Sequence, residues 1–203
     1  MSAIPEPIAP SAASPQLLAT VRNRIFDEIA VGDTDAIERT LSKEDIELFA
    51  ILSGDVNPQH LDADFAASTS FQGVVAHGML GGSLISAVLG NRLPGPGTIY
   101  LAQTLDFLAP VRIGDRLHVS VTVTARDEAR QRLTLACRCV NQHGTTVVSG
   151  QAQVQALELR VFPHQLGLLG DLDASDHLLL DEQCAPDVAQ EPGNAAPRPA
   201  PRR

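Results

Sequence analysis

The chain has 203 residues, a formal net charge of −9 and a hydrophobic content of 44%. Its acidic balance argues against nucleic acid or an anionic membrane as the main partner, because both bind to a basic face. No run approaches the roughly 20 apolar residues of a membrane span, and residues 1–20 lack the basic and apolar regions of a secretory signal. We therefore expect one domain with extensions, in a cytoplasmic protein.

Changes in composition along the chain suggest three parts. Residues 1–20 carry four prolines among small residues and predict a flexible arm. We expect the domain itself over residues 21–157, followed by an extension over 158–203 that is largely disordered at its end. Inside the domain, the apolar run at residues 25–31 predicts a first strand, and a turn follows at 32–33.

Helical signals come next. Ser42 and Asp45 have the spacing of a capping box, which predicts a helix that starts there and ends near Gly54. Pro58 predicts a loop over residues 55–60. Residues 62–68 predict one or two further helical turns.

A longer apolar helix is predicted over residues 78–89, and after it the hydrophobic period changes from helical to alternating. The helix is apolar on nearly every side, which predicts burial. One buried helix followed by antiparallel strands indicates an α+β domain. The predicted strands cover residues 98–108, 116–126, 132–140 and 145–156.

The cysteines predict reduced thiols. Cys137 and Cys139 lie two residues apart in a strand-like run, too far apart in extended geometry for a relaxed disulfide, and Cys184 stands alone near the end. Reduced thiols are typical of the cytoplasm. No cysteine and histidine spacing resembles a zinc site, so we expect no metal.

Two motifs carry the chemical signal. Residues 53–60 read Ser-Gly-Asp-Val-Asn-Pro-Gln-His, which places the carboxylate of Asp55 and the imidazole of His60 on one short segment. His77 and Gly78 then begin the apolar helix, whose first N–H groups lack partners within the helix. A base, an acid and a hydrogen-bond donor are what water addition to a conjugated carbonyl needs.

Each of these residues also has an ordinary structural explanation. Asp55 alone would suit a turn before a proline, His60 a surface loop, and Gly78 close packing. The combined spacing favours a site over these explanations. A metal site built from Asp55, His60 and His77 is conceivable, but no cofactor motif supports one.

The run from Phe49 to His60, with Ala66 beyond it, resembles the signature of (R)-specific enoyl-CoA hydratases, the MaoC-like branch of the hotdog-fold dehydratases and hydratases. The resemblance covers residues 24–156, and Gln59 stands where an aliphatic residue is usual. It implies a single hotdog fold, with a long central helix wrapped by a curved antiparallel sheet. It also implies that two protomers join their sheets, with the active site near the dimer interface. Further matches are His77-Gly78-Met79-Leu80, Ser86, Gly97-Thr98-Ile99-Tyr100 and Gly114-Asp115.

The resemblance implies a homodimeric hydro-lyase that reversibly hydrates trans-2-enoyl-CoA to (R)-3-hydroxyacyl-CoA without a cofactor. It makes Asp55 and His60 the catalytic pair and leaves open which of them protonates the α-carbon. Gly78 would polarise the thioester carbonyl through its backbone N–H. Supporting roles are expected for Asn57 in bracing the loop, Ser86 near the site, and Arg92 and Arg112 at the CoA diphosphate.

Two other functions stay open from the sequence. An enzyme of the same fold would dehydrate 3-hydroxyacyl groups on acyl carrier protein, or branched acyl-CoAs. A non-catalytic hotdog module would bind acyl-CoA without turnover. The presence of both Asp55 and His60 favours an enzyme over the binding module.

Overall fold

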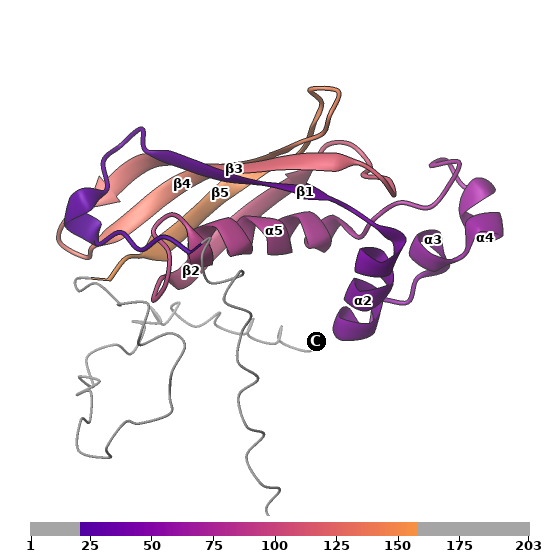
Figure 1. Cartoon of the computed structure of the whole chain (residues 1–203), viewed down its shortest axis with the longest axis horizontal. Helices are drawn as coiled ribbons and strands as arrows, with labels where there is room; N and C mark the ends of the chain where they lie inside the picture. The colour runs from indigo at the N-terminus through magenta and orange to yellow at the C-terminus, as the bar shows by residue number, and fades with distance from the viewer. Residues whose placement is uncertain (1–20, 158–203) are drawn as a thin grey trace, which may run out of the picture. The chain divides into compact units, whose positions relative to one another are not determined.

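The computed structural model describes residues 21–157, and the predicted arm and C-terminal extension lie outside them. A five-stranded antiparallel sheet lies over one long helix (Figure 1). Helix α5 (Gly78–Asn91) packs against β3, β4 and β1. The α+β class predicted from the sequence is confirmed. The strand order is β1-β3-β4-β5-β2, with β1 Thr34–Thr40, β2 Ile99–Phe107, β3 Arg116–Asp127, β4 Arg132–Val140 and β5 Thr146–Gln155.

The core lies between the sheet and α5. Alternate side chains of β3 and β4 point into it, as the sequence period predicts. Cys137 and Cys139 are both buried and unbridged. The predicted extents of β2 to β5 agree with the structure within one or two residues. The fully buried side chains include Ile85, Val88 and Leu89 of α5 and Leu117, Val119, Val121, Leu133 and Leu135 of the sheet.

Helix α2 (Lys43–Ser53) forms where the capping box predicts it. The Ser42 hydroxyl accepts the Asp45 N–H at 3.2 Å, and the Asp45 carboxylate accepts the Ser42 N–H at 2.9 Å. Gly54 ends the helix with φ of 76°, a left-handed conformation that glycine adopts without steric cost. A short helix α4 (Ala63–Ala67) follows, within the range predicted for it.

The first predicted strand is wrong. Residues Phe26–Glu28 form a 3-10 turn, η1, and Ile29 follows it. Phe26 and Ile29 are both buried, at a spacing of three rather than two. The strand begins only after the glycine turn, as β1. Its side chains are mostly polar because it forms one edge of the sheet, and this composition concealed it.

The loop predicted at residues 55–60 is also partly wrong, because α3 (Pro58–Leu61) begins inside it. Pro58 occupies the first helical position, where its fixed φ suits the helix and its missing N–H is not needed. The Asn57 side chain caps this turn by accepting the Gln59 N–H at 3.0 Å. His60 is therefore helical, while Asp55 stays in the loop.

Three short helices, α2, α3 and α4, lie together beyond one end of α5 (Figure 1). Helix α5 is not buried on every side, since Met79 and Ser86 are exposed. Its buried face covers the sheet and its first turn faces the short helices. Among residues 21–157, no helix is both long and apolar enough to span a membrane.

Candidate active site

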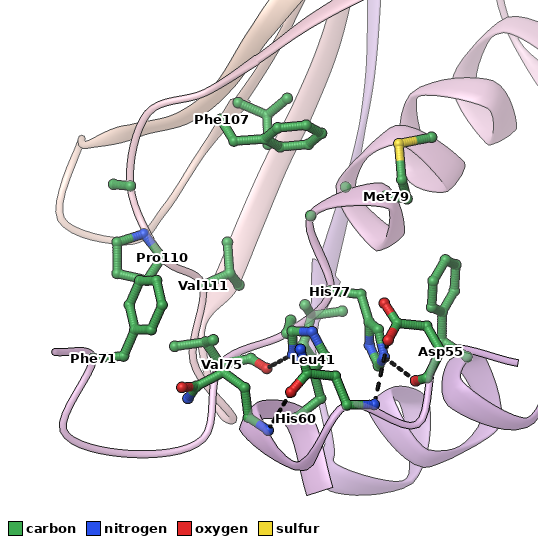
Figure 2. A pocket seen from close by; sticks show the side chains of 18 of the residues that line it. Leu41, Asp55, His60, Phe71, Val75, His77, Met79, Phe107, Pro110 and Val111 are labelled. Atoms are coloured by element: carbon green, nitrogen blue, oxygen red, sulfur yellow. Dashed lines mark hydrogen bonds between the residues drawn. The ribbon is translucent and has the colours of Figure 1, made fainter. Parts of the chain in front are cut away.

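A cavity of about 700 Å³ opens between α2, α3, the start of α5 and the segment before β3. Most of its wall is apolar, and its polar side chains gather around the two sequence motifs. Figure 2 shows Asp55, His60 and His77 close together, with Phe71 and Pro110 on another part of the wall. The lining includes Leu41, Phe49, Val75, Val111, Leu117 and Val148.

Asp55 is oriented by a tight turn at the end of α2. Its N–H donates to the Ser53 hydroxyl at 3.2 Å, and its carboxylate accepts the Asn57 N–H at 3.3 Å. The preceding Gly54 provides the left-handed residue that turns the chain toward the cavity. Asp55 remains exposed, so its carboxylate is open to water and to a ligand.

His60 is half-buried and held in one tautomer. Its Nδ1 lies 2.7 Å from the carbonyl oxygen of Val75. Because a carbonyl oxygen only accepts, Nδ1 carries the proton of the neutral ring. The Nε2 lone pair is then free to accept a proton from a ligand or a water molecule.

His77, which the sequence analysis left outside the catalytic set, touches both members of the pair. Its Nε2 donates to the backbone oxygen of Asp55 at 2.9 Å, and its ring lies 3.8 Å from the His60 ring, centroid to centroid. The side chain is only 4% exposed, and its Nδ1 is buried without a partner in the described part of the chain. In this part of the chain the Nδ1 atom therefore has no acceptor to pair with a second proton.

Gly78 is the first residue of α5 and lines the same cavity. Within residues 21–157 its N–H has no acceptor, as expected at the first position of a helix. A Cβ at this position would come within 2.9 Å of the Phe107 ring. Glycine therefore leaves room for a ligand beside a free N–H at the positive end of the helix.

The other predicted site residues fall in different places. Asn57 lines the cavity, but it holds Asp55 through its backbone N–H and uses its side-chain amide to cap α3. Arg112 does not line the cavity, but its guanidinium donates at 2.6 Å to the carbonyl of Phe71, which does. Ser86 is exposed on α5 and does not line the cavity. Arg92 follows the last residue of α5 and pairs with Asp35 at 3.5 Å.

Gln59 is the second site residue without a role in the sequence analysis. Within the described residues, only Gln59 and His77 are buried polar side chains, and both line the cavity. Gln59 donates through Nε2 to the Gly73 carbonyl at 3.1 Å. Its position next to His60, in place of an aliphatic residue, was the available signal in the sequence.

Asp55, His60 and His77 each offer one atom that could bind a metal, and these atoms lie within 4.8 Å of one another. One nitrogen of each ring bonds a backbone carbonyl, which leaves the other nitrogen of each ring available. The two available nitrogens and the Asp55 carboxylate suit proton transfer.

Comparison with known proteins gives consistent matches. The family model described as MaoC like domain matches residues 30–141, more than half of the chain. The 3-hydroxybutyryl-CoA dehydratase of Methylorubrum extorquens is 45% identical over 139 residues, which cover 68% of this chain and 88% of that protein. The (R)-specific enoyl-CoA hydratase of Rhodospirillum rubrum is 46% identical over 129 residues, which cover 64% of this chain and 89% of that protein. The R-hydratase PhaJ1 of Pseudomonas aeruginosa, solved without ligand, superposes with a TM-score of 0.67 at 45% identity, and covers 70% of this chain and 90% of that one.

Proposed function

Since the chain belongs to the MaoC-like domain family, we propose that it reversibly adds water to trans-2-enoyl-CoA and gives (R)-3-hydroxyacyl-CoA. The names of its relatives, a 3-hydroxybutyryl-CoA dehydratase and an (R)-specific enoyl-CoA hydratase, support a hydro-lyase. The stated product configuration follows those relatives. The expectation of an enzyme rather than a binding module is strengthened by the same matches.

One observation carries the proposal: Asp55 and His60 present reactive atoms within 4.8 Å of each other in a cavity that also contains the free N–H of Gly78. That separation suits a single water molecule held by both side chains. The remaining wall is apolar and suits an acyl chain.

In the proposed reaction, the carbonyl oxygen of the thioester accepts the Gly78 N–H, which stabilises the charge that develops there. Asp55, as a carboxylate, orients the water. His60 accepts one water proton at Nε2, because its own proton is engaged with the Val75 carbonyl. The water oxygen bonds to the β-carbon, and His60 passes the proton to the α-carbon, so that one O–H bond and the C=C π bond are exchanged for one C–O and one C–H bond. His60 is our assignment for the proton carrier.

His77 contributes without exchanging protons. Its N–H holds the Asp55 backbone, and its ring stacks on the His60 ring, so that it supports both members of the catalytic pair.

Two further parts belong to the proposal. Arg112, which bonds the cavity-lining Phe71, is our candidate for a CoA phosphate, whereas Arg92 is paired with Asp35. A homodimer joined at β2 is supported by the open edge of that strand, where Ile99, Tyr100 and Leu101 are 44%, 41% and 38% exposed. A cytoplasmic location stays a prediction.

The test is loss of the conjugated thioester absorbance when the protein is mixed with crotonyl-CoA, with chiral analysis of the product. We expect turnover in the wild type and a loss of roughly 100-fold or more in Asp55→Asn and in His60→Gln, since general acid–base groups contribute 10²–10⁴. Asp64→Asn and His143→Gln, at exposed residues outside the cavity lining, are the matched controls. No turnover with enoyl-CoAs of four to twelve carbons, or undiminished activity in both variants, would refute the proposal. A strong preference for the carrier-protein thioester would change the assigned substrate but leave the assigned reaction as it is.

A further inference from the structure

Gln59 places a buried carboxamide in the cavity wall next to His60. The side chain is 9% exposed, and its Nε2 donates to the Gly73 carbonyl at 3.1 Å. Burying an amide costs free energy unless its hydrogen bonds are made, so this bond is needed to keep Gln59 in place. The Gly73 carbonyl belongs to the same segment as the Val75 carbonyl, which accepts the hydrogen bond of His60.

Residues 71–75 form a segment whose alternate carbonyls each accept a side chain from elsewhere. The Phe71 carbonyl accepts Arg112 at 2.6 Å, the Gly73 carbonyl accepts Gln59, and the Val75 carbonyl accepts His60 at 2.7 Å. The contact between Gln59 and Gly73 lies two residues from the oxygen that fixes the His60 tautomer. A shift of the segment at Gly73 therefore moves the acceptor of His60.

Helix α3 cannot provide this precision alone. It has four residues, which is too short for a helix to be stable without tertiary contacts. Asn57 caps its start, but the orientation of its far end depends on the two side chains that reach the 71–75 segment. Gln59 and His60 are consecutive, so the Gln59 bond fixes the backbone from which the His60 ring projects.

We infer that Gln59 is a positioning residue for the reaction, which acts through residues 73–75 to keep Nε2 of His60 aimed at the water. The inference rests on the proposed function, because it assigns Gln59 a role in that chemistry. The inference differs from a purely structural role for Gln59 because it predicts an effect on kcat rather than on KM. Gln59 itself transfers no proton.

The primary test compares Gln59→Met with Gln72→Met. Both remove an amide from a glutamine, but Gln72 is exposed on the 71–75 segment and does not line the cavity. We expect Gln59→Met to lower kcat roughly threefold to tenfold, the effect of one hydrogen bond, with little change in KM. Gln72→Met should match the wild type.

A double-mutant cycle then separates positioning from a general structural role. In a His60→Gln background, Gln59→Met should cause no further loss of kcat, because the group that it positions is gone. A multiplied loss would show that Gln59 acts independently of His60. A raised KM with unchanged kcat in Gln59→Met would show that Gln59 affects only substrate binding. Unchanged kcat and KM would show that its hydrogen bond to Gly73 does not affect the reaction. Each of these outcomes overturns the inference.

A readout that does not need turnover separates this inference from the proposed function. Long-range ¹H–¹⁵N correlation spectra, with the His60 signals identified by their loss in His60→Gln, report which ring nitrogen carries the proton. We expect the Nδ1–H form in the wild type and a mixture of both tautomers in Gln59→Met. A single unchanged tautomer would overturn the inference even if the enzyme is active. If Gln59→Met does not fold, Gln59→Glu keeps the shape, places an acceptor opposite the Gly73 carbonyl, and should show the same change.

Discussion

The contribution of the Gly78 N–H can be measured by removing that single donor. Replacing Gly78 by glycolic acid, through an amber codon, exchanges the N–H for an ester oxygen and adds no side chain. An ordinary substitution cannot be used at this position, because the added Cβ would lie 2.9 Å from the Phe107 ring. The ester adds no atom there and leaves the shape of the cavity intact.

The expected loss follows from the surroundings of the donor. Removing one donor from an oxyanion site typically costs 10²–10³ in kcat, or about 2.7–4 kcal/mol. Gly78 is exposed in the single chain, so water competes for the developing charge. We therefore expect a loss of about 100-fold, at the lower end of that range.

The assay is the initial rate of crotonyl-CoA hydration at saturating substrate, compared with a matched ester elsewhere. An ester also weakens the carbonyl before it, and the His77 carbonyl accepts the Leu80 N–H at 3.1 Å. Ala63, the first residue of α4, replaced by lactic acid provides the control, since its N–H also starts a helix and lies outside the cavity lining. Equal kcat values for the Gly78 ester and the wild type, with both proteins folded, would refute the role of this donor.

Three other predictions concern His77, the start of α2 and the cysteines. His77→Phe keeps a ring against His60 but loses the hydrogen bond to the Asp55 backbone, so its kcat should fall roughly tenfold. His77→Gln retains an N–H donor, so its kcat should lie much closer to that of the wild type. Equal kcat values in the two variants would contradict this role of His77. The Ser42 N–H, followed by Arg39, holds the pKa of Asp45 below its ordinary value of 3.8. The stabilising effect of the carboxylate is therefore present above that value and lost as the pH falls through the lowered pKa. Urea unfolding of Asp45→Asn against the wild type should show a difference near pH 6 that narrows as the pH falls below 3.8. Burial raises the pKa of Cys137, and it raises the pKa of Cys139 to about 12. In a Cys184→Ser variant, iodoacetamide should therefore label neither thiol of the native protein and both thiols of the denatured protein. Labelling of the native variant would argue against a closed core.

Much of the fold could be predicted because hydrophobic residues recur in most strands with the period of that structure and because capping residues mark the helix ends. β3 alternates cleanly, and α2 is bounded by a capping box and a glycine. β1 escaped prediction because an edge strand needs only one side chain, Ile37, against the core. α3 escaped prediction because a proline usually indicates the end of a helix, whereas Pro58 occupies the first helical position, which favours proline.

Of the candidate site, the sequence could indicate which residues are reactive but not which residues hold them. Asp55, His60 and Gly78 share a motif with chemical meaning, and they share a cavity. The bonds from His77 to Asp55 and from Gln59 to Gly73 join segments 22 and 14 residues apart. No local pattern encodes such contacts, because they depend on how α3 and the start of α5 meet.

The site is thus assembled from two stretches that would not be ordered separately. Residues 53–61 contain a turn and a single helical turn, and residues 71–78 contain a nearly irregular segment and the first residue of a helix. Each bond between them is worth only about 1 kcal/mol, so no single contact fixes the geometry. The anchor is α5, whose buried face fixes His77 and Gly78 against the sheet. From this fixed end, His77 orients Asp55 and the Val75 carbonyl orients His60, so the precision of the loop derives from the core rather than from the loop itself.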